Sequence, residues 1–106
     1  MPKYLIQGSY SDKGLKGLLE EGGSKRREAA EQSIKGLGGR LEAFYYAFGT
    51  DDFAIIVDLP GNVDATALSL AANASGAVES RTTVLITPEE IDQATKKTVN
   101  FHPPGE

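Results

Sequence analysis

Polar side chains spread over three predicted strands could meet in one cavity. The segments Lys3–Tyr10, Phe53–Leu59 and Val78–Ile86 are rich in Tyr, Ile, Val and Thr, which favours β-strands. If the first strand lies between the other two, side-chain alternation places a mixed polar and apolar set on one face. The polar members of this set are Gln7, Ser9, Asp58, Arg81 and Thr83. They predict a small-ligand site, whereas the structural alternative is an Arg81 contact with Asp58 or with a backbone carbonyl.

Other candidate groups lie outside this set. Tyr45 and Tyr46 point to opposite faces of a predicted strand, so only one can line an interface, and either hydroxyl could donate to a ligand. The pair Asp51-Asp52 could bind a cation or act as a base, but formation of the turn explains it adequately. The run Lys25-Arg26-Arg27 could recruit a phosphate or a carboxylate, although nearby Glu residues favour a solvated, ion-paired face.

Composition excludes much of the familiar chemistry. The 106-residue chain has no cysteine, which rules out disulfides, thiolate metal sites and cysteine nucleophiles. The single histidine, His102, lies in a Pro-rich tail, where we expect it to be solvated rather than a base or a haem ligand. No GxSxG, HExxH or Walker sequence is present. We therefore expect no metal and no cofactor.

Charge and hydropathy bear on partners and compartment. A net charge of −4 suits the nucleic-acid backbone poorly, so no nucleic acid is expected as a partner. The apolar run Phe53–Val57 is far too short for a membrane span, and the first residues lack the apolar core of a signal peptide. We expect a cytoplasmic protein that does not bind membranes.

The order of predicted elements indicates a fold. The segments Arg40–Phe48 and Phe53–Leu59 read as second and third strands, Asp12 to Leu37 as a broken helical region, and Asn62 as the cap of a helix that ends at Gly76. A capping box at Thr87 and Glu90 starts a last short helix, about Pro88 to Lys97. The result is a ferredoxin-like β-α-β-β-α-β domain over residues 1–97, an α+β fold with an irregular tail over 98–106. Its two main helices cover one face of a four-stranded antiparallel sheet.

The second and third strands are apolar on both faces, but helices on one side of the sheet can cover only one of these faces. In the second strand we expect Leu41, Ala43, Tyr45 and Ala47 on one face and Phe44, Tyr46 and Phe48 on the other. The uncovered side would be an exposed apolar patch. A second copy packed on that side, giving a homodimer, is the expected solution. The alternative is a monomer whose last helix and tail fold over the face.

Several segments together resemble one family. They are PKYLIQGSYSDKG at the start, LGGRLEAFYYAFG, the turn GTDDFAIIVDLP and the ending RTTVLITPEEI. Over about nine-tenths of the chain the sequence is similar to the GYD-domain family. Gly49 and Asp52 match the family's name motif, while Asp51 stands where Tyr is usual. The resemblance implies a dimeric α+β barrel, a superfamily that includes cofactor-independent monooxygenases, lactone isomerases, haem enzymes and effector-binding modules.

Two functions follow as expectations. The first is a small homodimeric module that binds a small molecule or has a structural role, without catalysis. The second is a cofactor-independent enzyme, monooxygenase-like or isomerase-like, that acts on a small apolar or aromatic molecule inside the barrel. Such an enzyme needs a polar group, for example Tyr45, Tyr46, Arg81 or His102, to position the substrate or move a proton. Fold alone does not choose between them.

Overall fold

The computed structural model describes residues 1–106, whose elements follow the order β-α-α-β-β-α-β-α. The four strands are β1 (Lys3–Tyr10), β2 (Arg40–Tyr46), β3 (Phe53–Asp58) and β4 (Val78–Leu85). The four helices are α1 (Asp12–Glu21), α2 (Gly23–Gly36), α3 (Asn62–Ala74) and α4 (Pro88–Thr95).

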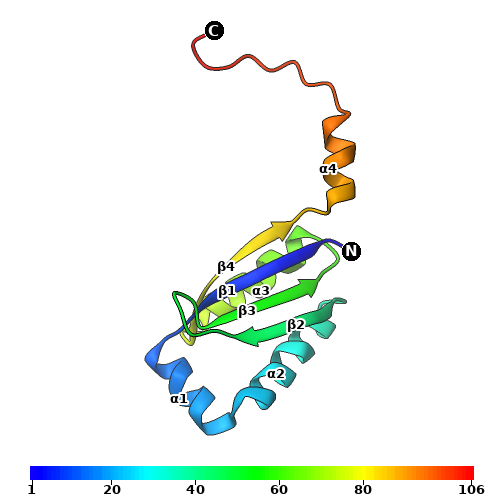
Figure 1. The fold of residues 1–106 in the computed structure, drawn as a ribbon. Coiled ribbons are helices and arrows are strands. Elements are labelled where there is room, and N and C mark those ends of the chain that lie inside the picture. The colour runs from blue at the N-terminus through cyan, green and yellow to red at the C-terminus, as the bar shows by residue number, and fades with distance from the viewer.

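The four strands form one antiparallel sheet in the order β2-β3-β1-β4 (Figure 1). The first strand thus lies between the third and the fourth, and α2 and α3 lie on the same face of the sheet. This arrangement confirms the predicted ferredoxin-like α+β fold.

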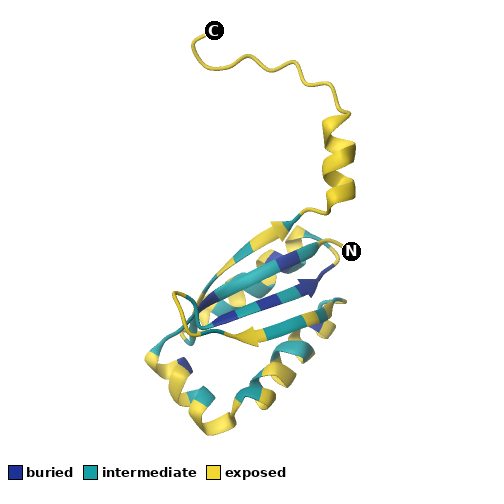
Figure 2. Cartoon of the chain, viewed as in Figure 1, coloured by how far each residue is buried: buried dark blue, intermediate teal, exposed yellow.

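The core lies between this face of the sheet and the two helices. Tyr4 of β1 and the alternate β3 residues Phe53, Ile55 and Val57 are buried there, because side chains of a strand alternate between faces. Leu59 extends the same row, and Ile34 and Ala65 meet it from α2 and α3. Figure 2 shows the buried residues gathered on the two central strands. The opposite face of the sheet, the open face, is covered by no element of the chain (Figure 1).

One residue of β2 lies on the face opposite to the predicted one. The strand register shifts between Leu41 and Ala43, so that Leu41 pairs with Val57 and packs against the core. A β-bulge inserts one residue and reverses the faces of everything before it. The prediction that Leu41 shares a face with Ala43 and Tyr45 was therefore wrong, and the open face of β2 consists of Ala43 and Tyr45 beyond the bulge.

Local signals explain most helix boundaries. The Ser11 side chain caps α1, and Thr87 with Glu90 forms the capping box of α4, which the sequence predicted. The helical region breaks at Gly22, whose φ of 84° suits glycine. The predicted cap at Asn62 was wrong, because the N-cap of α3 is Gly61. The Asn62 side chain instead accepts a hydrogen bond from the Tyr4 hydroxyl at 2.7 Å.

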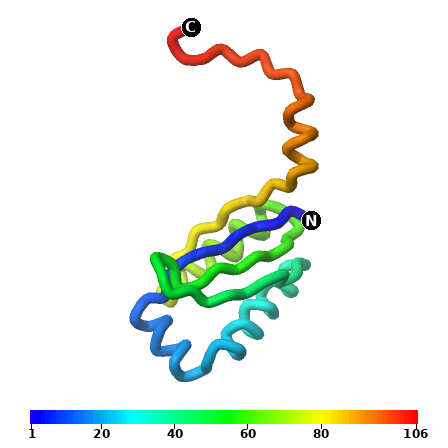
Figure 3. The backbone as a smooth tube through the Cα atoms, in the orientation of Figure 1, coloured from blue at the N-terminus to red at the C-terminus, as the bar shows by residue number.

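The C-terminal segment leads away from the sheet. Every residue from Ile86 to Glu106 is exposed, and α4 and the chain after it extend outward in Figures 1 and 3. The alternative in which the last helix and the tail cover the open face is therefore wrong for the single chain. No helix is long and apolar enough to cross a membrane.

Candidate functional site

The open face carries six of the seven side chains predicted to line a ligand site. Side-chain alternation and the strand register place them there, opposite the buried row of β1 and β3. They are Gln7, Ser9, Tyr45, Asp58, Arg81 and Thr83. The seventh, Tyr46, points to the helix side, where its hydroxyl donates to the Gly23 carbonyl at 2.9 Å. His102 is exposed in the tail, far along the chain from any strand.

The polar residues of the open face do not converge on one point. Asp58 accepts hydrogen bonds from Lys3 at 2.8 Å and Arg40 at 2.9 Å. Arg81 is paired with Gln7, four residues along β1 from Lys3, or about 13 Å away at the strand rise. The predicted contact between Arg81 and Asp58 was therefore wrong, because the two lie at different levels of the sheet.

The actual partner of Arg81 comes from the loop between β2 and β3. The guanidinium donates to both carboxylate oxygens of Asp51, at 3.0 and 2.8 Å. This bidentate pair lowers the pKa of Asp51 and raises that of Arg81, chiefly through the hydrogen bonds themselves. Both groups lie at the surface, so we assign the pair a role in fixing the loop over β1 and β4.

Asp52 has a different partner and a structural role. Its Oδ2 accepts from the backbone N–H of Tyr10 at 2.9 Å, and its own N–H donates to the Gly8 carbonyl at 2.8 Å. The Asp52 carbonyl also accepts from Ala47 at 2.8 Å. Asp51 and Asp52 thus bind separate groups, and the structure contains no cluster of three metal-ligating side chains. The motif residue Gly49 lies in the same loop, with open space where a Cβ would be.

Removing the Asp58 charge should cost stability in a pH-dependent way. The hydrogen bond from Lys3, helped by that from Arg40, lowers the pKa of this carboxyl below its ordinary value of 3.8 against the effect of burial. A lowered pKa stabilises the folded state above the ordinary pKa, and this stability is lost as the pH falls through the folded-state pKa. Asp58→Asn should lose about 1–3 kcal/mol at pH 7, and its difference from wild type should shrink as the pH falls below the ordinary carboxyl pKa of 3.8. Urea unfolding as a function of pH measures this, and a loss that does not change with pH would contradict it.

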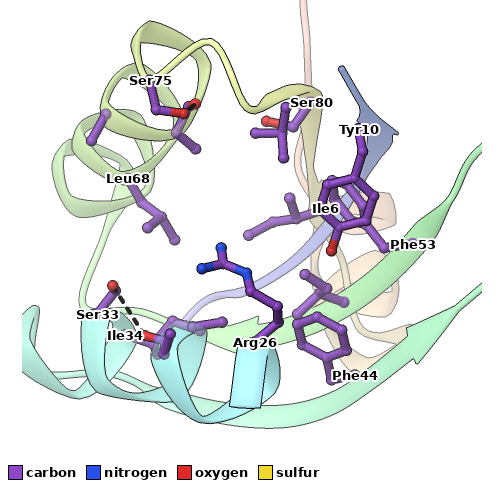
Figure 4. A pocket seen from close by; sticks show the side chains of 16 residues that line it. Ile6, Tyr10, Arg26, Ser33, Ile34, Phe44, Phe53, Leu68, Ser75 and Ser80 are labelled. Carbon is purple, nitrogen blue, oxygen red and sulfur yellow. Dashed lines mark hydrogen bonds between the residues drawn. The ribbon is translucent and has the colours of Figure 1, made fainter. Parts of the chain in front are cut away.

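An apolar cleft with polar groups at its wall lies on the helix side of the sheet. It has a volume of about 360 Å³ and lies between α2, α3 and the covered face of the sheet (Figure 4). Twelve of its 16 lining residues are hydrophobic. The larger of them are Ile6, Phe44, Phe53, Ile55, Leu68 and Val78. Volume and lining both suit a small apolar molecule.

Two further polar side chains, Arg26 and Tyr10, line the cleft. The hydroxyls of Ser33, Ser75 and Ser80 already bond within the chain. The Arg26 side chain projects into the cleft from α2 (Figure 4), and the Tyr10 ring stands at its wall against Phe53. Burial, together with the nearby Tyr46, raises the pKa of Tyr10 to about 12, so its hydroxyl stays protonated. The cleft thus offers one cation and one neutral donor in apolar surroundings.

Sequence reasoning placed Arg26 on a solvated face and missed this cleft. A signal was present, because Arg26 lies four residues before Ala30 and eight before Ile34, on the same helical stripe. An arginine in phase with the apolar stripe of a helix points toward the core side rather than to water.

The structure therefore defines a small ferredoxin-like α+β domain with one open sheet face and one apolar cleft between helices and sheet. A family model described as GYD domain matches residues 4–95, so the chain belongs to the GYD domain family. The match ends with α4, so residues 1–3 and 96–106, which include the whole tail, lie outside it. No curated protein and no solved structure matches the chain significantly.

Proposed function

We propose that the protein is a small-ligand-binding module that acts as a homodimer, with one ligand in the cleft of each copy. The observation that carries the proposal is the cleft itself. Twelve of the 16 residues that line this hollow of about 360 Å³ are hydrophobic, and Arg26 and Tyr10 add two polar groups to it. Its size falls in the range of small-molecule sites.

The open face supports the homodimer. Its apolar residues run across the three strands β1, β3 and β2 and include Leu5, Ala54, Ile56, Ala43 and Tyr45. Tyr45 is 70% exposed in the single chain. Most charges at this face are already paired, Asp58 with Lys3 and Arg40, and Arg81 with Asp51, while the exposed Glu79 lies on the edge strand β4, away from the apolar centre. A second copy can therefore cover the apolar centre without burying an unpaired charge.

The second candidate, a cofactor-independent enzyme, would use the same cleft. Proton transfer is most effective when the catalytic pKa lies near the working pH. The two titratable side chains that line the cleft are Arg26 and Tyr10, and the pKa of Tyr10 is raised to about 12. This pair suits recognition of a ligand better than movement of a proton, which favours the binding module.

Filling the cleft should abolish binding of an apolar probe. Ala72 lines the cleft, whereas Ala67 of the same helix is exposed and lies outside it. Ala72→Phe should weaken binding of the fluorescent probe N-phenyl-1-naphthylamine at least tenfold, roughly the loss of 1.4 kcal/mol of apolar burial. Ala67→Phe is the matched control and should bind as wild type does. Fluorescence titration measures this, with circular dichroism to verify folding.

Two results would overturn the proposed site. One is a wild-type protein that does not bind the probe at all. The other is a folded Ala72→Phe variant that binds it as tightly as wild type, since the probe would then occupy another surface.

A further inference from the structure

Arg26 is placed where a purely structural arginine is not expected. It stands on α2 among Ala29, Ala30 and Ser33, and Figure 4 shows its guanidinium directed between Leu68 and Ile6. An arginine normally keeps its charged end in water while its stem covers apolar surface. Here the charged end itself projects into the apolar hollow.

The guanidinium has no firm partner within the chain. It donates no hydrogen bond to another residue, although an arginine carries five N–H donors. Its one ion pair is with Glu21, at 3.6 Å between Nη1 and Oε2, and both side chains are about two-fifths exposed. An exposed pair at that distance contributes little.

The other paired arginines show what a structural role looks like in this fold. Arg40 donates to the nearly buried Asp58 at 2.9 Å, and Arg81 holds Asp51 through two hydrogen bonds. Both span different elements and fix them in place. Arg26 makes no such hydrogen bond between elements, so the packing of the chain does not explain its position.

The rest of the cleft is electrically suited to a negative charge. None of its 16 lining residues is acidic, so the one carboxylate that an anion at Arg26 must compete with is that of Glu21, which lies outside the lining in the weak pair at 3.6 Å. Attraction between charges strengthens when apolar groups replace water around them. The Tyr10 hydroxyl remains protonated and adds a neutral donor.

We infer that the cleft selects small apolar molecules that carry a carboxylate, with the carboxylate held by Arg26 and the apolar body against Ile6, Phe44 and Leu68. The inference rests on the proposed ligand-binding function and specifies its ligand class. The planar guanidinium matches a carboxylate in bidentate fashion, as Arg81 and Asp51 do at the surface. The cleft volume limits the body to a medium-length chain or one or two rings.

A displacement experiment tests the inference on the full-length protein. N-phenyl-1-naphthylamine reports occupancy, and decanoate and decanol compete with it below their aggregation concentrations. The two competitors share a chain and differ in the charged group. Decanoate should displace the probe at concentrations at least about tenfold lower than decanol, the factor expected for a charge-assisted hydrogen-bonded pair.

Two variants then test whether Arg26 causes the preference for decanoate over decanol. Arg26→Met keeps an unbranched stem without the charge, and should remove the preference for decanoate over decanol, with circular dichroism to verify folding. Arg27→Met, at the exposed neighbouring position, should leave the preference unchanged. Probe binding by Arg26→Met also shows that the cleft of that variant is folded. Should it fail to bind the probe, Arg26→Gln takes its place in the same measurement.

The outcomes separate this inference from the proposed function. A wild type that does not bind the probe refutes the function itself. Probe binding without a decanoate preference refutes only the ligand class. A preference that survives in Arg26→Met, or that disappears equally in Arg27→Met, refutes the role of Arg26.

Discussion

Replacement of Ile56 by glutamate should convert the proposed homodimer to a monomer. Ile56 lies on the open face in β3, with Leu5 of β1 and Ala43 of β2 as its lateral neighbours. In a two-fold symmetric dimer each copy contributes the same residue, so one substitution introduces two carboxylates into the interface. Burial of an unpaired charge is costly, and we expect the dimer to weaken at least about 1,000-fold, or roughly 4 kcal/mol. Size-exclusion chromatography with light scattering measures the mass directly.

The control for this substitution introduces the same charge elsewhere. Val63 of α3 is 83% exposed and lies outside the open face, so Val63→Glu should remain a dimer at twice the chain mass of 11.3 kDa. The homodimer is refuted if the wild type is a monomer at micromolar concentration. Dimerisation through the open face is refuted if folded Ile56→Glu keeps the dimeric mass.

Alanine at Gly14 should strongly destabilise the fold, although glycine is a poor helix former. Gly14 is buried in α1, and a Cβ built there would clash with the Ala77 carbonyl oxygen. That oxygen also accepts the hydrogen bond from the Ser11 backbone N–H at 3.0 Å, which fixes the start of α1 against the entry to β4. Because the clash is with backbone, the helix must move away, and we expect a loss of roughly 3 kcal/mol in the free energy of unfolding.

Gly17 offers a matched control one turn further along the same helix. A Cβ at Gly17 meets nothing within 4 Å, so Gly17→Ala gains helix propensity without a clash. It should stabilise the protein by about 0.5–1 kcal/mol. Chemical unfolding of both variants gives the two free energies. Changes of the same sign would contradict the close approach of α1 to the Ala77 carbonyl.

Much of the fold could be predicted because the local signals are strong. Alternation of apolar residues defined Lys3–Tyr10 as a strand, and the capping chemistry of Ser11 and Thr87 placed two helix starts. The bulge at Leu41–Ala43 could not be predicted from alternation, since nothing in the local pattern shows that one residue is left unpaired. Asn62 fits the cap pattern, but its side chain accepts a hydrogen bond from Tyr4 instead. Because Tyr4 lies 58 residues earlier in the sequence, no local pattern predicts this contact.

The candidate site was harder to predict than the fold. Alternation correctly assigned Gln7 and Arg81 to one face, but it carries no information on which carboxylate reaches an arginine. The Asp51 contact depends on how the loop between β2 and β3 folds across β1. The cleft depends on the spacing between α2 and α3, which is a tertiary property. Only the position of Arg26 could be inferred from the sequence, because its spacing from Ala30 and Ile34 places it on the apolar side of the helix.

The central claim is that a small apolar ligand binds in the cleft between α2, α3 and the sheet. Two-dimensional ¹H–¹⁵N NMR during titration with N-phenyl-1-naphthylamine tests it most directly, because it locates the bound probe. We predict saturable shifts in the amides of α2 and α3 that line the cleft, such as Ala30, Leu68 and Ala72. Amides of the open face, such as Gln7 and Arg81, should change little. No saturable shifts, or shifts confined to the open face, would contradict the account.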